Sequence, residues 1–529
     1  MVVGSGFGGL TAGLYLLQNG LSVTIVEKSS MVGGAGRHAC NLHVNCGGTK
    51  AQAEIGYFWP TTDPQGNPLE AFDATSALVQ FENLTGQHSI DTKLLMRVLE
   101  EGPAWMDWLV EQDGMHLVLM PVGPLANKAF VDEDVATGAQ NAILGLNRTT
   151  EAFEADIRAL GGEILLNTAC TGLVKDGNAI VGVQVGSDAS AQTIKANKGV
   201  ILCSGGFGYN MDMLEKYAPS AYMYANQGGP TMQHTGEVIR MGVGAGADIA
   251  GYNSFCCWET GLDEYWGSGD GNYYHYMMSQ GTHVAFSPFL RLDVRGNRIP
   301  VYSLTAPEYV GCPFSFAVES NAAMQMAMPT HNAYIIMDSN YAQYQAMFME
   351  LGACSPHLLG ARSEVAQSYI TKDWDEEFEE LVERGAILKA DTLEELEQKA
   401  GMVSGSLVKA VEKWNKVVAS GVDPNPVPMP PVLMTPVEKG PFYCMKSGGQ
   451  IGKTLAGLRI NDFGQVLDTK GAVIEGLYAG FTAAGGYTGE NTFLGQFGMV
   501  GPMGSVAMSG AGGYICARGL LNQLPEYDY

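Results

Sequence analysis

The first 26 residues alternate between short apolar runs and one helical apolar face. Met1–Val3 is an apolar run that predicts a strand, and Ser22–Val26 predicts a second one. Between them, Leu10–Leu17 carries apolar residues at helical spacing, and Asn19-Gly20 closes that helix. A strand, a helix and a strand in this order form a βαβ unit, which is typical of a parallel sheet.

The same kind of apolar strand recurs twice further along the chain. Lys198–Phe207 and Gly476–Gly489 each predict a strand that runs into a glycine turn, and Gly495–Pro502 is expected to open a final helix. Residues 364–418 show apolar residues at helical spacing with charged outer faces, so we predict solvated surface helices without chemistry there.

The pattern also divides the chain. From about Asn253 to Met445 the glycine rhythm weakens and aromatic density rises. A chain of 529 residues is too long for one hydrophobic core. We therefore predict an α/β protein in which a Rossmann-like domain of residues 1–252 and 446–529 is interrupted by an α+β capping domain of residues 253–445.

Composition excludes several classes of function. The net charge of −25 disfavours nucleic acid and anionic membranes as partners. The ten cysteines contain no C-x-x-C pair and indicate reduced thiols, and no metal site is expected. Residues 491–517 carry no charge but are rich in glycine, so we do not expect a membrane span.

The location of the protein is expected to be cytoplasmic, with an extracytoplasmic one left open. Met1-Val2-Val3 leads straight into Gly4, so the first strand begins half-way along, as in a trimmed precursor.

The turn after the first strand carries the first candidate chemistry. Gly4-Ser5-Gly6-Phe7-Gly8-Gly9 has the spacing G-x-G-x-x-G, and the acidic Glu27 ends the second strand. Glycines there allow a tight turn, close approach of backbone N–H groups to a diphosphate and close packing of helix on strand. Glu27 can accept hydrogen bonds from ribose hydroxyls and would repel a 2′-phosphate. This context predicts dinucleotide binding without separating FAD from NAD.

Further glycine clusters favour FAD. They are Gly33-Gly34, which follows Glu27-Lys28 closely, then Cys46-Gly47-Gly48, Ser204-Gly205-Gly206 and the segment 476–489. With these motifs, with HTGEVIRMGVGAGA at 234–247 and with the closing GLYAG, the chain resembles the FAD-dependent oxidoreductase family of fumarate reductase and succinate dehydrogenase flavoproteins. That family includes 3-ketosteroid dehydrogenases and urocanate reductases, and its fold places the flavin between the FAD domain and the cap.

The resemblance implies a set of FAD contacts. Gly4, Gly6 and Gly9 would lie on the diphosphate, flanked by Ser204 and Gly205, with Glu27 and its neighbour Lys28 at the adenosine ribose. Ala169 would contact the adenine. The ribityl and isoalloxazine path would be lined by Gly33, Gly34, Cys46, Gly47 and Gly48. Gly498, Met499 and Val500 would offer helix N-terminal N–H groups to the flavin pyrimidine, where a helix dipole stabilises negative charge.

Three departures argue against fumarate as substrate. The family's H-G-A-N-R-L-G-G-N becomes Thr488–Gln496, which lacks the arginine that clamps a carboxylate. Its H-H-T-M-G-G becomes Gly452–Gly457, which lacks the substrate histidine, and Tyr302–Tyr309 lacks the proton-donor arginine. Gly449–Thr454 is closer to the ketosteroid dehydrogenases, yet their expected tyrosine is Phe493 here, which cannot carry a proton.

We therefore expect an enzyme that moves a hydride between flavin N5 and a carbon–carbon bond polarised by a carbonyl or carboxyl group. The favoured direction is reduction of a neutral or aromatic enone or enoate, with Tyr302, His283 and Lys453 as candidate proton-transfer residues. Desaturation beside a ketone is the alternative, and a flavin electron carrier is the alternative of another class. No NAD, FMN or haem motif is evident, so we expect an electron-donor or electron-acceptor protein as partner, with a missing N-terminal segment as the alternative source of reducing equivalents.

Overall fold

The computed structural model describes the chain in segments. These are residues 1–39, 41–85, 90–120, 127–133, 146–186, 191–224, 233–258, 284, 287–299, 329–351, 374–425, 428–448, 450–495 and 502–528.

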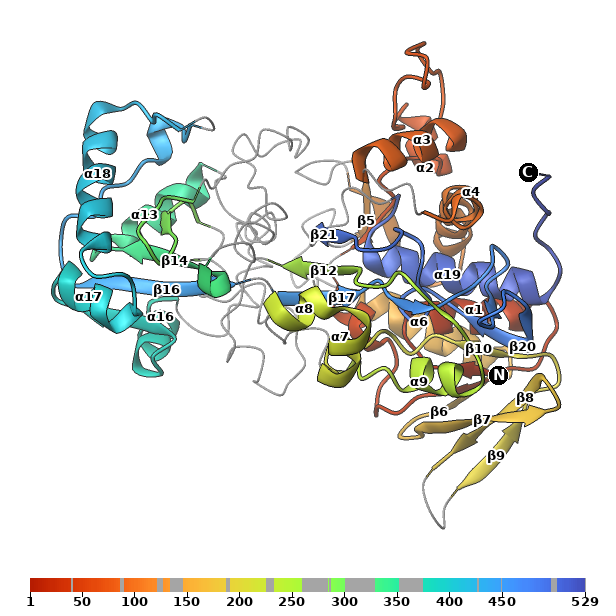
Figure 1. Cartoon of the computed structure of the whole chain (residues 1–529). Helices are drawn as coiled ribbons and strands as arrows, with labels where there is room; N and C mark the ends of the chain where they lie inside the picture. The colour runs from red at the N-terminus through yellow and green to blue at the C-terminus, as the bar shows by residue number, and fades with distance from the viewer. Residues whose placement is uncertain are drawn as a thin grey trace.

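A six-stranded sheet forms the centre of the larger body, on the right of Figure 1. Its order is β19 (Gln465–Leu467), β20 (Val473–Ala479), β10 (Val200–Leu202), β1 (Val2–Val3), β2 (Thr24–Val26) and β6 (Glu163–Leu165). All neighbours pair in parallel except β19, which pairs with β20 antiparallel. The three strands expected around glycine turns are therefore present, and they lie side by side.

Two helices that are far apart in sequence pack against each other beside this sheet. α1 (Phe7–Gln18) packs along α19 (Ser505–Leu520), which also packs against α4 (Thr92–Val110). Their glycines make this close approach possible: a Cβ at Gly513 would lie 1.9 Å from the Gly8 carbonyl oxygen, and one at Gly510 would lie 2.0 Å from Trp105. The uncharged C-terminal stretch thus supplies a core helix, and none of the described helices is long and apolar enough to cross a membrane.

Smaller elements surround the large sheet. The helices are α2 (Lys50–Glu54), α3 (Ala74–Thr85), α6 (Asn147–Ala159), α7 (Met211–Tyr217), α8 (Pro219–Tyr224), α9 (Glu237–Gly244) and the 3-10 turn η1 (Gly34–His38). Two antiparallel sheets consist of β7 (Cys170–Asp176), β8 (Ala179–Val185) and β9 (Gln192–Lys195), and of β3 (Leu42–His43), β5 (Ala129–Asp132) and β4 (Leu117–Leu119). A short pair joins β11 (Ile249–Ala250) to β18 (Gly457–Leu458).

The second body, on the left of Figure 1, is an antiparallel sheet with helices. Its strand order is β13 (Leu290–Leu292), β14 (Asn332–Met337), β16 (Phe442–Gly448) and β15 (Ile387–Ala390). The helices are α13 (Tyr341–Glu350), α16 (Trp374–Glu383), α17 (Leu393–Ala400) and α18 (Ser406–Ser420), with the 3-10 turns η5 (Pro329–His331) and η6 (Pro431–Leu433). Helices were predicted across 364–418, and strand β15 between them was not.

The described residues form two hydrophobic clusters. One draws on the chain before residue 257 and after residue 450, whereas the other consists of residues 284–445 together with Ala129. The predicted α/β fold with an FAD-type domain is confirmed. The domain boundaries at 252 and 445 remain a prediction.

A three-stranded sheet lies between the two bodies and joins distant parts of the sequence. β12 (Phe255–Trp258) pairs antiparallel with β17 (Gln450–Thr454) and parallel with β21 (Phe493–Gly495). Phe255 faces Thr454 on one side and Phe493 on the other. The two described segments that depart from the fumarate reductase pattern therefore flank the same strand, β12, one on each side.

Candidate functional site

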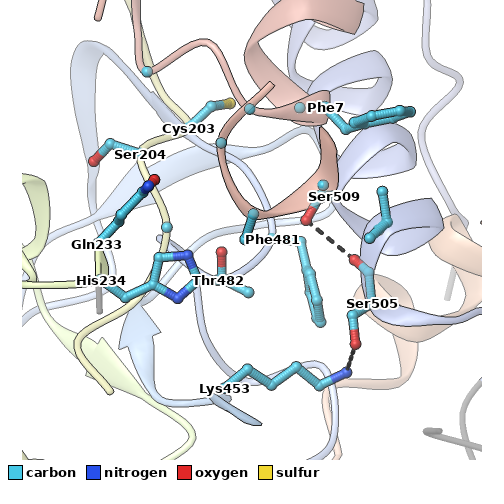
Figure 2. A pocket seen from close by; sticks show the side chains of 18 of the residues that line it. Phe7, Cys203, Ser204, Gln233, His234, Lys453, Phe481, Thr482, Ser505 and Ser509 are labelled. Carbon is cyan, nitrogen blue, oxygen red and sulfur yellow. Dashed lines mark hydrogen bonds between the residues drawn. The ribbon is translucent and has the colours of Figure 1, made fainter. Parts of the chain in front are cut away.

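A cavity opens where β1, β2 and β10 end (Figure 2). In a parallel sheet, ligands bind outside the carboxyl ends of the strands, where helix N-termini also point. Its wall includes the glycine turn at the start of α1, the end of β2, the Ser204–Gly205 turn, the segment 233–238 and the start of α19.

The glycine turn brings two backbones closer together than a side chain would permit. Gly4 has φ +93, and a Cβ there would lie 2.7 Å from Ser204 Cα. Its N–H donates to Val26 O at 2.8 Å, which ties the turn to β2. Gly6 is the N-cap of α1 in extended conformation and offers no side chain to the helix N–H groups. Those donors therefore face the cavity, and an N-terminus of this kind favours a bound anion.

Glu27 is held in place by its own surroundings. Its carboxylate accepts hydrogen bonds from Ser5 N and Ser5 Oγ, both at 2.8 Å, and from Ser29 N at 2.8 Å. Each carboxylate oxygen has two acceptor positions. Ser5 uses both positions on Oε2 and Ser29 uses one on Oε1, so one position on Oε1 remains for a donor such as a ribose hydroxyl. Burial and these bonds fix an acceptor at one end of the cavity.

Lys28 ties the end of β2 to the opposite wall of the cavity. Its ammonium donates to Gln233 O at 3.0 Å, to Thr235 Oγ1 at 3.1 Å and to Glu237 Oε1 at 3.1 Å. This half-exposed lysine therefore orders the segment 233–237 at the Glu27 end.

His234 is a wall residue that the sequence did not single out as a site residue. Its ring lies against Gly205, where φ is +87 and a Cβ would be 2.7 Å from His234 Cδ2. Burial lowers the pKa of His234 to about 4, and the nearby Lys28 ammonium acts in the same direction. The imidazole is therefore neutral at pH 7. Its position at the head of HTGEVIRMGVGAGA was the available signal.

The thiol of Cys203 also lies in the wall, beside Gly8 and Gly480. Burial raises the pKa of Cys203 to about 12. A thiol that stays protonated is a poor nucleophile, so Cys203 contributes packing and not chemistry.

The opposite end of the cavity contains a lysine whose side chain reaches the start of α19. Lys453, on β17, donates through Nζ to Ser505 Oγ, the first residue of that helix, as Figure 2 shows. The ammonium lies 5.5 Å from the centre of the Phe481 ring. Lys453 is 7% exposed, so its charge lies in a low-dielectric part of the wall.

The structure brings many of the predicted residues together. The cavity wall contains Gly4, Gly6, Glu27, Lys28, Gly34, Ala169, Ser204, Gly205 and Lys453. His283, Tyr302, Gly498, Met499 and Val500 lie outside the described residues.

Five other predicted residues lie behind this wall or away from it. A Cβ at Gly9 would be 1.9 Å from Gly4 O, so Gly9 serves helix–strand packing; Gly33 packs on Thr150. Gly47 lies against Phe58, and Gly48 lies between Phe72 and Pro103. Burial raises the pKa of Cys46 to about 12. Their contact with FAD remains a prediction.

The residues present fit a dinucleotide. The wall contains a glycine turn in which a Cβ at Gly4 would collide with the Ser204 backbone. It also contains a helix N-terminus without a side-chain cap and a fixed carboxylate at one end. With the parallel sheet behind it, this site defines a dinucleotide-binding protein of the Rossmann-like class. A family model described as "FAD binding domain" matches residues 1–497, and the chain belongs to that family. FAD is its cofactor, and the prediction of an FAD-dependent oxidoreductase family is confirmed.

Individual relatives agree with the family. The chain is 24% identical to an NADH:fumarate oxidoreductase of Klebsiella pneumoniae (strain 342) over 94% of its length, although the match spans only 45% of that relative. It is 26% identical to a vinyl phenol reductase of Lactiplantibacillus plantarum, over 93% of this chain and 90% of the relative. Among solved structures, 3-ketosteroid Δ1-dehydrogenase from Sterolibacterium denitrificans matches with a TM-score of 0.66 at 16% identity, covering 99% of both chains.

Proposed function

We propose that this protein reduces an activated carbon–carbon double bond of a neutral or aromatic enone or enoate, and that fumarate is not its substrate. FAD, when bound, supplies the hydride from N5. The chain's own residues hold the cofactor, position the alkene and move the proton.

The cofactor contacts follow from the cavity. Gly4, Gly6 and the Ser204–Gly205 turn would bind the diphosphate, because this part of the wall offers helix N–H groups and no side chain that blocks approach. Glu27 would accept the adenosine ribose hydroxyls, and Ala169 would lie beside the adenine. The flavin end of the dinucleotide then falls toward Lys453, Phe481 and Ser505.

Thr492 is the single observation that carries the substrate proposal. It occupies the position of the family's carboxylate-clamping arginine. It is 3% exposed, and its hydroxyl donates to Thr488 O at 2.6 Å. A buried, short side chain whose hydroxyl is used by its own turn cannot form the paired charged hydrogen bonds of an arginine fork. Recognition of a dicarboxylate loses its main anchor.

The neighbouring strand supports the same conclusion. β17 carries Lys453 where the family has its substrate histidine, and Lys453 extends to Ser505 at the start of α19. The third departure, Tyr302–Tyr309, lies outside the described residues.

The relatives include reductases of the proposed kind. Their names include a vinyl phenol reductase, an NADH:acrylate oxidoreductase of Vibrio harveyi and a urocanate reductase of Eggerthella lenta. The first and last of these substrates join an alkene to an aromatic ring. This agrees with a site that lacks the dicarboxylate clamp.

The proton donor and the electron donor remain proposals. Tyr302 and His283 stay candidates for protonation, and Lys453 is the candidate that lies in the cavity. Because the chain spans less than half of the Klebsiella relative, we propose that electrons reach the flavin from another protein or from a further domain.

A second candidate function is desaturation beside a ketone. It is favoured by the similarity of Gly449–Thr454 to ketosteroid dehydrogenases and by a relative named 3-oxosteroid 1-dehydrogenase, from Mycolicibacterium smegmatis. The replacement of the expected tyrosine by Phe493 disfavours it.

Stopped-flow kinetics separate these functions. The photoreduced enzyme is mixed under anaerobic conditions with fumarate, urocanate, cinnamates, 4-vinylphenol and ketosteroid enones, and flavin absorbance is followed. We expect fast reoxidation by one neutral or aromatic alkene and none by fumarate. If no alkene reoxidises the flavin and a saturated ketone instead bleaches the oxidised enzyme, the desaturase is correct. If neither an alkene nor a ketone changes the flavin absorbance, the result favours an electron carrier.

A further inference from the structure

The flavin end of the cavity contains a buried positive charge that can act on the cofactor as well as on the substrate. Lys453 is buried in the wall, donates to Ser505 Oγ and lies 5.5 Å from the Phe481 ring centre. Ser505 begins α19, a helix of 16 residues whose N-cap, Gly504, provides no side-chain cap. A lysine charge and the positive end of a helix dipole therefore act on the same place.

The orientation of the dinucleotide in the cavity decides which part of it would contact the Lys453 ammonium. Figure 2 shows Ser204 and Gln233 on one side of the cavity and Lys453 and Ser505 on the other. Lys28, which follows Glu27 directly, donates to Gln233 O at 3.0 Å, and Gly4 packs on Ser204, so Glu27 and the glycine turn belong to the first side. A dinucleotide with its adenosine ribose on Glu27 and its diphosphate on the turn has its isoalloxazine ring toward Lys453. The start of α19 presents N–H donors there. The pyrimidine edge of the ring carries carbonyl and ring-nitrogen acceptors, so it is the edge that fits these donors.

We propose that Lys453, supported by Ser505, binds the pyrimidine edge of the flavin and raises its reduction potential. The inference rests on the proposed FAD reaction but assigns Lys453 to the cofactor and not to protonation of the substrate. Two-electron reduction adds one proton at N5 and leaves one negative charge in the pyrimidine ring. A fixed cation beside that ring stabilises the reduced form more than the neutral oxidised form, and it gives up no proton in the step.

Ser505 makes the arrangement more specific than a charge alone. Its oxygen accepts from Lys453, so its own hydroxyl proton remains available for a carbonyl acceptor. The hydroxyl therefore positions the ammonium and can add a hydrogen bond to the same ring edge.

The midpoint potential of the flavin in the purified holoenzyme tests the proposal. It is measured by equilibration with a reference dye during slow anaerobic reduction, for the native protein and for Lys453→Met, Lys453→Arg and Lys175→Met. Lys453→Met should lower the ratio of reduced to oxidised flavin at a fixed potential by about tenfold, which is a shift of about −30 mV for a two-electron couple. Lys453→Arg should retain most of the native potential.

Lys175→Met is the matched control, because it removes the same charge from an exposed position on β7 outside the cavity wall. It should leave the potential within a small fraction of the Lys453→Met shift. Equal shifts in both variants would reduce the effect to net charge and overturn the proposal. So would an unchanged potential in Lys453→Met combined with a raised KM for carboxylate substrates.

A measurement without any substitution covers the case in which a variant does not retain FAD. The native protein is reconstituted with 8-mercapto-FAD, whose sulfur shares its negative charge with the pyrimidine ring. A cation at that ring draws the charge inward, so we expect a strong long-wavelength absorption band. A spectrum like that of the free analogue would overturn the proposal. Because no alkene takes part, either result is independent of whether the enzyme reduces double bonds.

Discussion

At Gly4 the absence of a side chain is a requirement of the site. The residue combines a positive φ with a backbone neighbour 2.7 Å from where its Cβ would be. The sequence could predict this position because the G-x-G-x-x-G spacing and the strand before it are local. The partner, Ser204, lies 200 residues away and becomes a neighbour only when β10 pairs with β1.

Gly4→Ala should therefore remove FAD binding, whereas Gly20→Ala should not. Gly20 also has a positive φ, +80, but nothing lies within 4 Å of its Cβ position. In both variants the strained backbone lowers the free energy of unfolding by about 1 kcal/mol or more. Only Gly4→Ala also disturbs the diphosphate site. Flavin absorbance per protein after gel filtration, together with urea unfolding, separates the two effects. Equal flavin content in both variants would show that the close contact at Gly4 is unimportant.

His234 shows what a sequence motif leaves out. The low pKa of about 4 comes from burial against Gly205, a contact across 29 positions that only the fold creates. Above pH 6.5 the ring is neutral both folded and unfolded, so it adds no pH dependence. Between pH 6.5 and about 4 the unfolded chain binds a proton that the native protein does not. The stability of the native protein therefore decreases as the pH is lowered through this range.

His234→Gln should remove this contribution. Urea unfolding of the FAD-free protein should show a smaller loss of stability between pH 7 and pH 4.5 in the variant than in the native chain. An identical loss in both proteins would mean that His234 titrates normally.

Helix α19 has an unusual composition that serves close packing. Its run of small residues resembles neither a strong helix former nor a membrane span, and the structure uses it for close packing on α1, α4 and β20. The sequence placed the opening of this helix within 495–502, but the described helix begins at Ser505, after the extended Gly504. Glycine-rich patterns fix such boundaries poorly, because the packing partner and not the local propensity decides where the helix starts.

Gly513→Ala should destabilise the protein by about 1–3 kcal/mol, because its Cβ would meet the Gly8 backbone. Gly244→Ala, at the end of α9, meets nothing within 4 Å and should be neutral or stabilising by up to about 1 kcal/mol. Chemical unfolding of the two variants tests this. Equal stability would contradict close packing of α1 on α19.

In the molecule as a whole, the two bodies lie on either side of a sheet built from distant segments. Hydrophobic patterns predicted the class of each body and the surface helices, but strand β15 was missed because its four residues pair only with β16. The meeting of β12, β17 and β21 could not be predicted from local pattern, because each pairing joins segments far apart in the sequence.

A bidentate ion pair joins two distant segments of the second body. Arg298 binds Asp423 at 2.7 and 2.8 Å and stacks on Trp414, whereas Arg295 is exposed. Arg298→Met should cost about 3 kcal/mol, because it leaves the buried Asp423 carboxylate without its charge partner. Arg295→Met should cost less than about 0.5 kcal/mol. Thermal unfolding of both variants checks the contrast, and similar midpoints would show that the pair does not stabilise the cap.

We propose that this FAD site reduces a neutral or aromatic alkene and not fumarate. The most direct test is product formation in a single turnover. Photoreduced enzyme is mixed anaerobically with one equivalent of 4-vinylphenol, a cinnamate or fumarate, and products are quantified by mass spectrometry beside flavin absorbance. We expect one saturated product per flavin reoxidised for an aromatic alkene, and no succinate. Succinate formed in equal yield, or a flavin that stays reduced with every alkene, would contradict it.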